Sequence, residues 1–265
     1  MAVNGMYFLD CGVLTCDKTF ITYKQGFGEL VDIPVVPVLI DTDDGYVLFD
    51  TGVDPAGLIL PDEVWGVKQS FIKQFTEEND IRVQLKKVGV SPQDIKYVVN
   101  SHFHWDHTGG NRFFDHSTIF VQKSEFRFGY YPDSAFEGSY IKRYFDHPLN
   151  YKLIEGDYEV VKGVYITTST GHTPGHQSLV VHLQNECAVL AGDAVYGKEC
   201  IEKNIPPGNS WDLSRGIESL NKLQHIAKRN NGHLYVTHDP NFWKEYKPAP
   251  FCYKQNARLI EHTEK

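Results

Sequence analysis

Four side chains that commonly bind metal ions lie within one short stretch of the chain. Residues 101–107 read Ser-His-Phe-His-Trp-Asp-His, which places His102, His104, Asp106 and His107 within six positions. They cannot share one face of a helix, where neighbours are three or four residues apart, but they can converge from a tight loop after a strand. Imidazole nitrogens with a carboxylate suit zinc, iron, manganese or cobalt. The cluster therefore predicts a metal-binding loop.

Three further donors follow predicted strands in the second half of the chain. His172 follows a strand expected at 164–168, Asp193 one at 188–191, and His238 one at 234–236. Side chains at strand ends can converge on one rim of a pair of sheets. With the first cluster they make seven donors, too many for one tetrahedral ion and suited to two ions that share a bridging carboxylate. The sequence thus predicts a site for two divalent metal ions.

The elements that must position these donors are mostly strands. In the first half we expect strands at 6–9, 20–23, 35–41, 46–49, 95–100 and 119–122, a helix at 81–88, and a loop excursion with a short helix at 54–80. Asp50 ends one of these strands and either makes a turn or supports the metal loop, and both readings stay open. The aromatic region 125–145 packs in a core or lines an apolar substrate pocket.

The second half repeats the β character and adds one clear helix. Strands are expected at 151–154, 158–161, 164–168, 178–183, 188–191 and 234–236, with an amphipathic helix at 211–228. Two β-rich halves, each followed by helices, indicate two sheets packed face to face with helices outside. No linker divides the chain, so we expect a single α/β domain over residues 1–265.

Composition limits the classes of function. Hydrophobic residues make up 41% and charged residues 23% of the 265 positions, as in a globular protein with a sizeable core. The net charge of -8 argues against general affinity for nucleic acid or anionic membranes. The chain has no apolar run of roughly 20 residues that could span a bilayer. Its N-terminus does not resemble a signal peptide. We expect a cytoplasmic protein without membrane insertion.

Cysteine usage agrees with a reducing compartment. The five cysteines are an odd, scattered set without a CxxC pair. A disulfide framework is therefore not expected, and each thiol is interpreted as a small buried apolar group.

The motifs together resemble those of a known family. The order HxHxDH at 102–107, GHTPGH at 171–176, GDA at 192–194 and a late His238 is similar to that of the metallo-β-lactamase superfamily. Residues 148–178 resemble, more narrowly, the N-acyl homoserine lactonases. Tyr196, three residues after Asp193, matches the active-site tyrosine of that family. The resemblance implies an αββα sandwich of two mixed β-sheets flanked by helices.

The resemblance also implies how the donors are shared. His102, His104 and His172 would hold one metal ion, and Asp106, His107 and His238 the other. Asp193 and a hydroxide would bridge the two ions, which are expected to be zinc, with iron, cobalt or manganese as alternatives. By the same resemblance His172, and not His176, is the ligand in the GHTPGH motif.

The implied reaction is hydrolysis of the lactone ring of an N-acyl homoserine lactone, the chemistry of quorum quenching. The bridging hydroxide would attack the carbonyl, Tyr196 would stabilise the tetrahedral intermediate, and Asp106 would return a proton to the leaving alkoxide. Trp105 would contact the substrate. The expected partner is therefore a small acyl lactone, and self-association as a homodimer stays open.

Other functions of the same fold are alternatives. They include a thioesterase of the glyoxalase II type, another small-molecule lactonase, a β-lactamase, and an iron oxidoreductase. The oxidoreductase would be an iron persulfide dioxygenase or a di-iron oxygen-reducing module, and His104 disfavours the di-iron type, which usually resembles HxExDH. The acidic charge disfavours a nuclease, and a metal-binding role without catalysis does not need an open two-metal centre. A near match to a phosphate-binding loop at 192–199 ends in Glu199, where Ser or Thr should hold magnesium.

Overall fold

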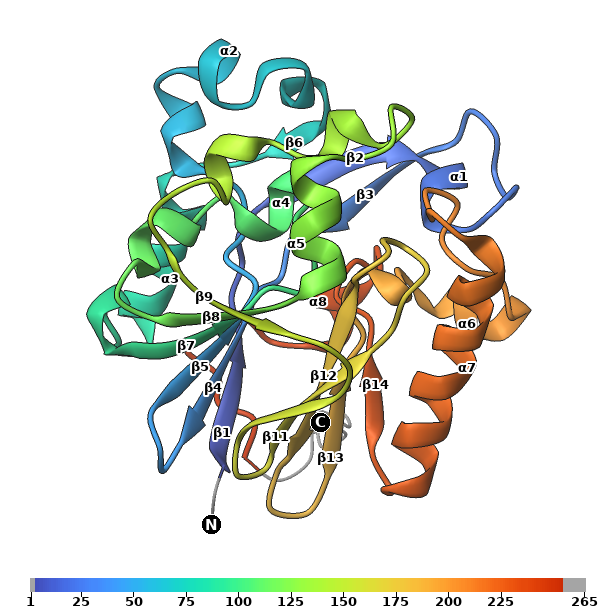
Figure 1. Cartoon of the computed structure of the whole chain (residues 1–265). Helices are drawn as coiled ribbons and strands as arrows, with labels where there is room; N and C mark the ends of the chain where they lie inside the picture. The colour runs from blue at the N-terminus through green and yellow to red at the C-terminus, as the bar shows by residue number, and fades with distance from the viewer. Residues whose placement is uncertain (1–2, 255–265) are drawn as a thin grey trace, which may run out of the picture.

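Two mixed β-sheets face each other, and helices cover their outer sides (Figure 1). The computed structural model describes residues 3–254, so residues 1–2 and 255–265 of the predicted domain lie outside the described residues. The predicted αββα sandwich is confirmed. No helix within residues 3–254 is both long enough and apolar enough to cross a membrane.

The first sheet has antiparallel strands on one side and parallel strands on the other. β1, β4 and β5 pair antiparallel, while β5, β7, β8 and β9 run parallel. Because β5 and β7 are parallel neighbours, the residues that follow them leave the sheet at the same edge. In sheet order the strands are β1 (Val3–Phe8), β4 (Val38–Thr42), β5 (Tyr46–Phe49), β7 (Ile95–Val99), β8 (Thr118–Gln122) and β9 (Asn150–Ile154).

The second sheet brings three more strand ends to one edge. Its neighbours pair antiparallel except for the last two, which are parallel. Strands two apart in an antiparallel sheet point the same way, so β11, β13 and β14 all end at the same edge. In sheet order the strands are β10 (Tyr158–Val161), β11 (Val164–Thr168), β12 (Gln177–His182), β13 (Cys187–Leu190) and β14 (His233–Tyr235).

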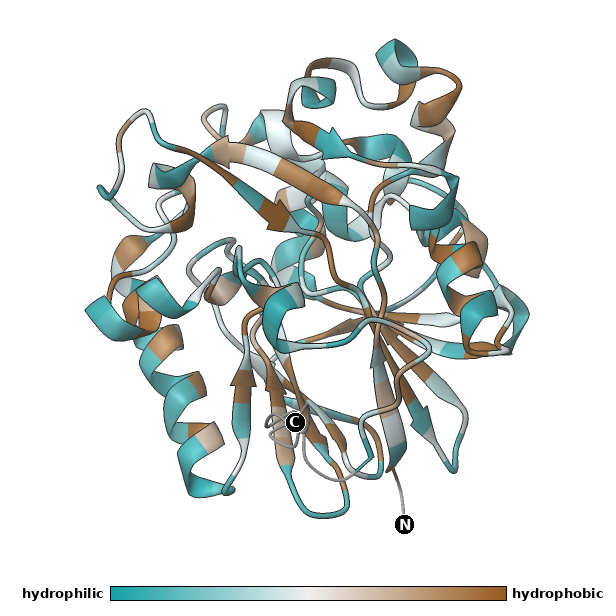
Figure 2. Ribbon diagram, turned by 180° about the vertical axis from the view of Figure 1, so that it is seen from behind, coloured by the Kyte–Doolittle hydropathy of each residue, from teal (hydrophilic) through white to brown (hydrophobic). Residues whose placement is uncertain are grey.

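The core lies between the sheets because successive residues of a strand point to opposite faces. Ile40 and Phe49 of the first sheet share one buried cluster with Ile166 and Leu190 of the second. The side chains in between point outward and form separate clusters with helices α3 (Ile81–Lys87) and α7 (Leu213–Arg229). Figure 2 shows hydrophobic residues concentrated along the strands.

A third, smaller sheet was not predicted. It consists of β3 (Leu30–Pro34), β2 (Val13–Asp17) and β6 (Ile72–Gln74), and it lies at the upper end of the sandwich in Figure 1. The strand expected at 20–23 is wrong, because that segment begins with helix α1 (Lys18–Ile21). The Asp17 carboxylate accepts a hydrogen bond from the Thr19 amide and so caps this helix.

Short helices connect the remaining strands. The excursion at 54–80 contains more than the single helix expected, and β6 returns it to the third sheet. The α-helices not yet given are α2 (Pro61–Val64), α4 (Trp105–Thr108), α5 (Lys123–Tyr130), α6 (Lys198–Lys203) and α8 (Phe242–Glu245). The 3-10 helices are η1 (Pro55–Leu58), η2 (Gly66–Phe71), η3 (Glu77–Asn79), η4 (Pro92–Asp94), η5 (Asn111–Phe114), η6 (Glu137–Ser139), η7 (Lys142–Tyr144) and η8 (Gly192–Ala194).

Candidate metal centre

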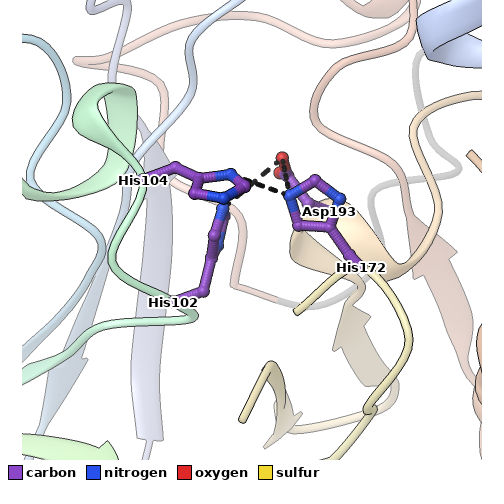
Figure 3. Close-up of side chains that lie close together, drawn as sticks. All are labelled: His102, His104, His172 and Asp193. Atoms are coloured by element: carbon purple, nitrogen blue, oxygen red, sulfur yellow. Dashed lines mark hydrogen bonds and ion pairs between the residues drawn. The ribbon is translucent and has the colours of Figure 1, made fainter. Parts of the chain in front are cut away.

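The seven predicted donors meet at the edge where β7, β11, β13 and β14 end. They form two groups, each with donor atoms within 4.8 Å of one another. Figure 3 shows how the side chains of one group converge from two sides of the edge. The first group is His102, His104, His172 and Asp193, and the second is Asp106, His107 and His238.

The first cluster is only partly a loop. The chain leaves β7 through a bend at Ser101, and His104 is the N-cap of the one-turn helix α4. The amide of His107 donates to the carbonyl of His104 over 3.1 Å. Asp106 and His107 therefore leave from a helical turn and reach the second group, whereas the two preceding histidines reach the first. The tight loop expected over the whole cluster applies to its first half.

Asp193 lies between the two groups and faces each with a different oxygen. Its Oδ1 is 3.1 Å from Nε2 of His107 and 3.1 Å from Nε2 of His238. Its Oδ2 is 3.3 Å from Nε2 of His172 and 3.8 Å from Nε2 of His102. Asp193 is the donor in contact with both groups, which is the geometry of a bridging carboxylate.

The spacing of the donors fits metal ions. Around a tetrahedral ion with bonds of ~2.1 Å, neighbouring donor atoms lie about 3.4 Å apart. The separations around Asp193 bracket this value, and Nε2 of His172 is 3.0 Å from Nδ1 of His104. Nε2 of His102 and Oδ1 of Asp193 are buried and have no hydrogen-bond partner within residues 3–254. Such atoms cost about 1–3 kcal/mol each, and two cations would satisfy both.

A single carboxylate at the end of β5 determines which ring nitrogen carries the proton in two of the histidine donors. Asp50 Oδ2 lies 2.8 Å from Nδ1 of His107 and accepts from the Ser101 hydroxyl over 2.7 Å. Ser101 has one hydroxyl hydrogen, so at 2.9 Å it must accept from Nδ1 of His102. Both histidines then carry their proton on Nδ1 and present Nε2 to the centre. Of the two readings left open for Asp50, the contacts favour support of the metal loop.

Backbone geometry places Asp50 for this task. Its φ is 61°, a left-handed conformation that is uncommon for residues other than glycine, asparagine and aspartate. Its Oδ1 accepts from the Ser101 amide over 2.7 Å, so the first residue of the metal loop is held by the same side chain. The backbone of Asp50 thus turns its carboxylate toward the neighbouring parallel strand.

The third sheet orients another donor. Nδ1 of His238 lies 2.7 Å from the carbonyl oxygen of Pro34, which can only accept. His238 therefore carries a proton on Nδ1 and directs Nε2 at Asp193. The carbonyl belongs to the end of β3, so a sheet that the sequence did not predict holds part of the centre.

His176, the other histidine of the GHTPGH motif, is in neither group. Its Nε2 accepts from the Asp193 amide over 3.0 Å, so this nitrogen carries no proton. Burial, followed by the neighbouring His172, lowers the pKa of His176 to about 3. It acts as a neutral acceptor that holds the backbone of Asp193.

The charges around the centre are those of a cation site. Burial opposes charge on His107, but Asp193, Asp106 and Asp50 outweigh it and raise the pKa of this side chain well above its usual value. Burial lowers the pKa of His102 and of His104 well below the usual value. Nε2 of His107 and the facing Asp193 oxygen thus need a positive charge between them, either a proton or a metal ion.

A cavity of about 340 Å³ opens beside the centre. His104, Trp105 and Asp106 form the part of its wall that belongs to the metal-binding stretch. Most of the remaining wall is apolar and comes from the third sheet, the 54–80 excursion and the 125–145 region, through Leu14, Ile33, Phe71 and Phe136 among others. Phe136 is thus a pocket residue, whereas Tyr140 and Phe145 pack in a buried cluster with Phe103. The aromatic region serves both purposes left open.

Tyr196 lies at the junction of cavity and centre. Its ring stacks on that of His238 with 4.9 Å between centroids, and it lines the cavity. Its hydroxyl accepts from Nδ2 of Asn209 over 2.9 Å. Asn209 lies in the segment between α6 and α7 and also lines the cavity.

Sequence reasoning did not single out several residues of this site. Ser101 precedes a donor directly, and its position beside His102 was the available signal. Lys68 and Asn209 line the cavity from distant segments and carried no signal, because their places depend on tertiary contacts.

Comparison with known proteins agrees with the geometry. Residues 31–238 match the family described as "Metallo-beta-lactamase superfamily". An N-acyl homoserine lactonase of Bacillus sp is 35% identical over 243 residues, covering 90% of this chain and 94% of the relative. The N-acyl homoserine lactonase AttM of Rhizobium radiobacter is 34% identical over 257 residues, covering 94% and 98%.

Solved structures are similar over the same length. An N-acyl homoserine lactone hydrolase with N-hexanoyl-L-homoserine bound at its catalytic metal center has a TM-score of 0.85 at 32% identity, covering 95% of this chain and 100% of that one. A mutant of Bacillus thuringiensis AiiA with N-decanoyl-L-homoserine at the active site has a TM-score of 0.85 at 33% identity, covering 95% and 100%. This chain belongs to the metallo-beta-lactamase superfamily and is related to the N-acyl homoserine lactonases.

Proposed function

We propose that this hydrolase of the metallo-beta-lactamase fold opens the lactone ring of N-acyl homoserine lactones to give N-acyl homoserines. The observation that carries the proposal is Asp193, whose two oxygens face two separate donor groups beside an apolar cavity. Relatives named as N-acyl homoserine lactonases, 34–35% identical over at least 90% of the chain, support the choice of substrate.

The residues fit two divalent cations, for which zinc is the first candidate because imidazole and carboxylate suit it. His102, His104 and His172 would hold one ion, Asp106, His107 and His238 the other, and Asp193 both. When bound, such a pair polarises a carbonyl oxygen and lowers the pKa of a coordinated water toward neutrality. The protein's own part is to fix the donors in the correct tautomers and to present the substrate.

Tyr196 is proposed as the hydrogen-bond donor to the substrate carbonyl. Burial, with the charges of Asp193 and Asp106, raises the pKa of Tyr196 well above its usual value, so the phenol keeps its proton at neutral pH. Because the hydroxyl accepts from Asn209, its own hydrogen can be donated, either to the neighbouring Asp193 or to a bound substrate. A donor held in place in this way stabilises the negative charge that develops on a carbonyl oxygen.

Asp106 is proposed to move the proton. Its Oδ2 lies 3.6 Å from Nε2 of His107 and 3.9 Å from Nε2 of His238, and its side chain also lines the cavity. It is therefore in reach of both the centre and a bound substrate. Opening a lactone releases an alkoxide, a poor leaving group, so a carboxylate that takes the proton carried by the attacking hydroxide and delivers it there lowers the barrier.

The cavity is proposed to bind the acyl chain. Its volume of about 340 Å³ lies within the range of small-molecule sites. Trp105 forms the wall next to the donors and would contact the substrate close to its ring. The apolar side chains further out would pack against the methylene groups.

The test is hydrolysis of butanoyl, hexanoyl, octanoyl and decanoyl homoserine lactones. Proton release measures the reaction, and the bound metal is determined on the same sample. We expect proton release with at least one chain length and two metal ions per chain. Simple γ-lactones, a glutathione thioester and a β-lactam in the same assay separate the alternative hydrolases. Flat traces with all four homoserine lactones on fully loaded protein would refute the proposal.

A further inference from the structure

Besides Asp50, a second buried carboxylate near the centre is in neither donor group. Glu125 lies in the first turn of α5 and is fully buried. Within residues 3–254 no lysine, arginine or histidine lies within ion-pair distance of it. A buried carboxylate without a basic partner is costly unless hydrogen bonds compensate for it.

Four hydrogen bonds offset part of this cost, and they are arranged in two matching pairs. Oε1 accepts from the Phe103 amide over 2.9 Å and from the Tyr140 hydroxyl over 3.1 Å. Oε2 accepts from the Gly175 amide over 3.1 Å and from the Thr173 hydroxyl over 2.6 Å. Each oxygen thus receives one backbone N–H, which cannot turn, and one hydroxyl, which can.

These contacts join the two segments that carry the three histidines of the first donor group. Phe103 stands between His102 and His104, and Thr173 directly follows His172. The Tyr140 ring also packs edge-on against His104, with 4.9 Å between centroids. None of the four contacts involves a residue of α4 or the segment after β14, which supply the second group.

The packing around this carboxylate is tight. A Cβ placed on Gly175 would lie 2.1 Å from the backbone nitrogen of Glu125. The segment after β11 therefore rests directly on the start of α5. A change in the Glu125 side chain is consequently transmitted to the histidine segments rather than absorbed by empty space.

We propose that Glu125 is a positioning residue that sets the metal affinity of the His102, His104 and His172 group and leaves that of the second group nearly unchanged. The inference rests on the metal-binding part of the proposed function and not on the substrate. Outer-shell partners of metal ligands typically change metal affinity 10–100-fold when they are replaced.

Glutamine is the sharpest test because its shape is the same and its hydrogen bonding is wrong. Its single carbonyl oxygen can serve one amide and one hydroxyl, but its NH2 group then faces the other amide. The hydroxyl on that side can turn to accept, whereas the backbone N–H cannot. In either orientation Glu125→Gln leaves the Phe103 or the Gly175 amide without an acceptor.

The experiment is a cobalt(II) titration of the metal-free full chain. Calorimetry measures the affinity of each binding event, and the visible spectrum reports the surroundings of each bound cobalt ion. Wild type should bind two ions. Glu125→Gln should weaken one binding event at least tenfold and the other less than threefold. The weakened event should be the one missing in His172→Ala, which removes a donor of the first group. In Glu125→Gln, the visible spectrum of the one cobalt ion that still binds tightly should match the spectrum of the cobalt ion bound to His172→Ala.

Thr173→Val provides the graded control. It removes one hydroxyl donor with little change in shape and leaves both amides satisfied, so it should weaken the same event by a smaller factor. It also keeps the test open if Glu125→Gln does not fold, which circular dichroism of the metal-free protein would show.

Two results would overturn the inference. One is unchanged affinity for both ions in Glu125→Gln, and the other is equal weakening of both, which would indicate a general loss of structure. Wild type that binds two cobalt ions and hydrolyses no homoserine lactone would refute the proposed substrate alone. Wild type that binds no cobalt would refute both.

Discussion

Replacing Asp50 by asparagine should weaken both metal sites, although Asp50 is a donor to neither. Asparagine adopts the left-handed backbone of this position at least as readily as aspartate, so the φ of 61° is not a source of strain in the variant. The two side chains have the same shape. The change is therefore confined to the hydrogen bonds of this side chain and to its negative charge, which is one of the charges that raise the pKa of His107.

The size of the effect follows from the direction of each hydrogen bond. The Ser101 amide cannot turn, so the amide oxygen of the variant stays on Ser101 N, where Oδ1 accepts over 2.7 Å. The NH2 group then faces the Ser101 hydroxyl and Nδ1 of His107. The NH2 group can donate to both only if each becomes an acceptor. His107 must then move its proton from Nδ1 to Nε2, and the Ser101 hydroxyl must donate to Nδ1 of His102, which moves the proton of His102 to Nε2 as well. In both histidines Nε2 is the nitrogen that faces the centre. Affinity should fall about 10–100-fold at each site, or about 1.4–2.7 kcal/mol per ion.

The assay is a zinc titration of the metal-free protein against a competing chelator, with Ser101→Ala as the matched control. That control removes the link to His102 and keeps the contact between Asp50 and His107, which measures 2.8 Å. It should therefore weaken one site, whereas Asp50→Asn weakens two. Affinities of Asp50→Asn within twofold of wild type at both sites would refute the tautomer argument.

Three further predictions concern the centre and its surroundings. Tyr196→Phe should lower kcat at least tenfold, because a positioned donor is lost, with metal content unchanged; unaltered kcat would leave Tyr196 a packing residue. Asp193→Asn should reduce bound metal below two ions per chain and activity with it, and full metal content with full activity would exclude a bridging role. The metal-free protein should lose stability as pH falls, because His176 has a folded pKa of about 3 against roughly 6.5 unfolded. The unfolded chain then binds more protons, so this contribution is complete above about pH 6.5 and declines toward pH 3. The midpoints of urea unfolding at pH 7 and at pH 5 test this prediction. If His176→Asn does not reduce the difference between the two midpoints, the prediction is contradicted.

Most of the strands and helices could be predicted from the sequence because their hydrophobic pattern is local. Strands such as β5 (Tyr46–Phe49) and helix α3 (Ile81–Lys87) carry their hydrophobic period within a few residues, so local pattern predicts them. The strand expected at 20–23 was wrong because the Asp17 carboxylate, which accepts from both the amide and the hydroxyl of Thr19, favours a helix over the β preference of the segment. The short strands of the third sheet, β2, β3 and β6, were not predicted.

The donor set is determined by residue type and by position after a strand, and both are written in the sequence. The order of strands in each sheet then brings the donors to one edge, and the resemblance to a known family anticipated that outcome. What local pattern could not supply is the direction of the hydrogen bonds that prepare the donors. Asp50 and His107 are 57 residues apart, and His238 and Pro34 are 204 apart.

The sequence by itself therefore determined which atoms could bind metal, and roughly where along the strands they stand. Only the tertiary structure decided which nitrogen of His102, His107 and His238 faces the centre, that Glu125 joins two donor segments, and which regions enclose the cavity. The physical reason is that the two kinds of property depend on residues at different distances along the chain. A side chain's chemistry belongs to one residue, whereas a proton's position and a cavity's shape depend on neighbours that only folding brings into contact.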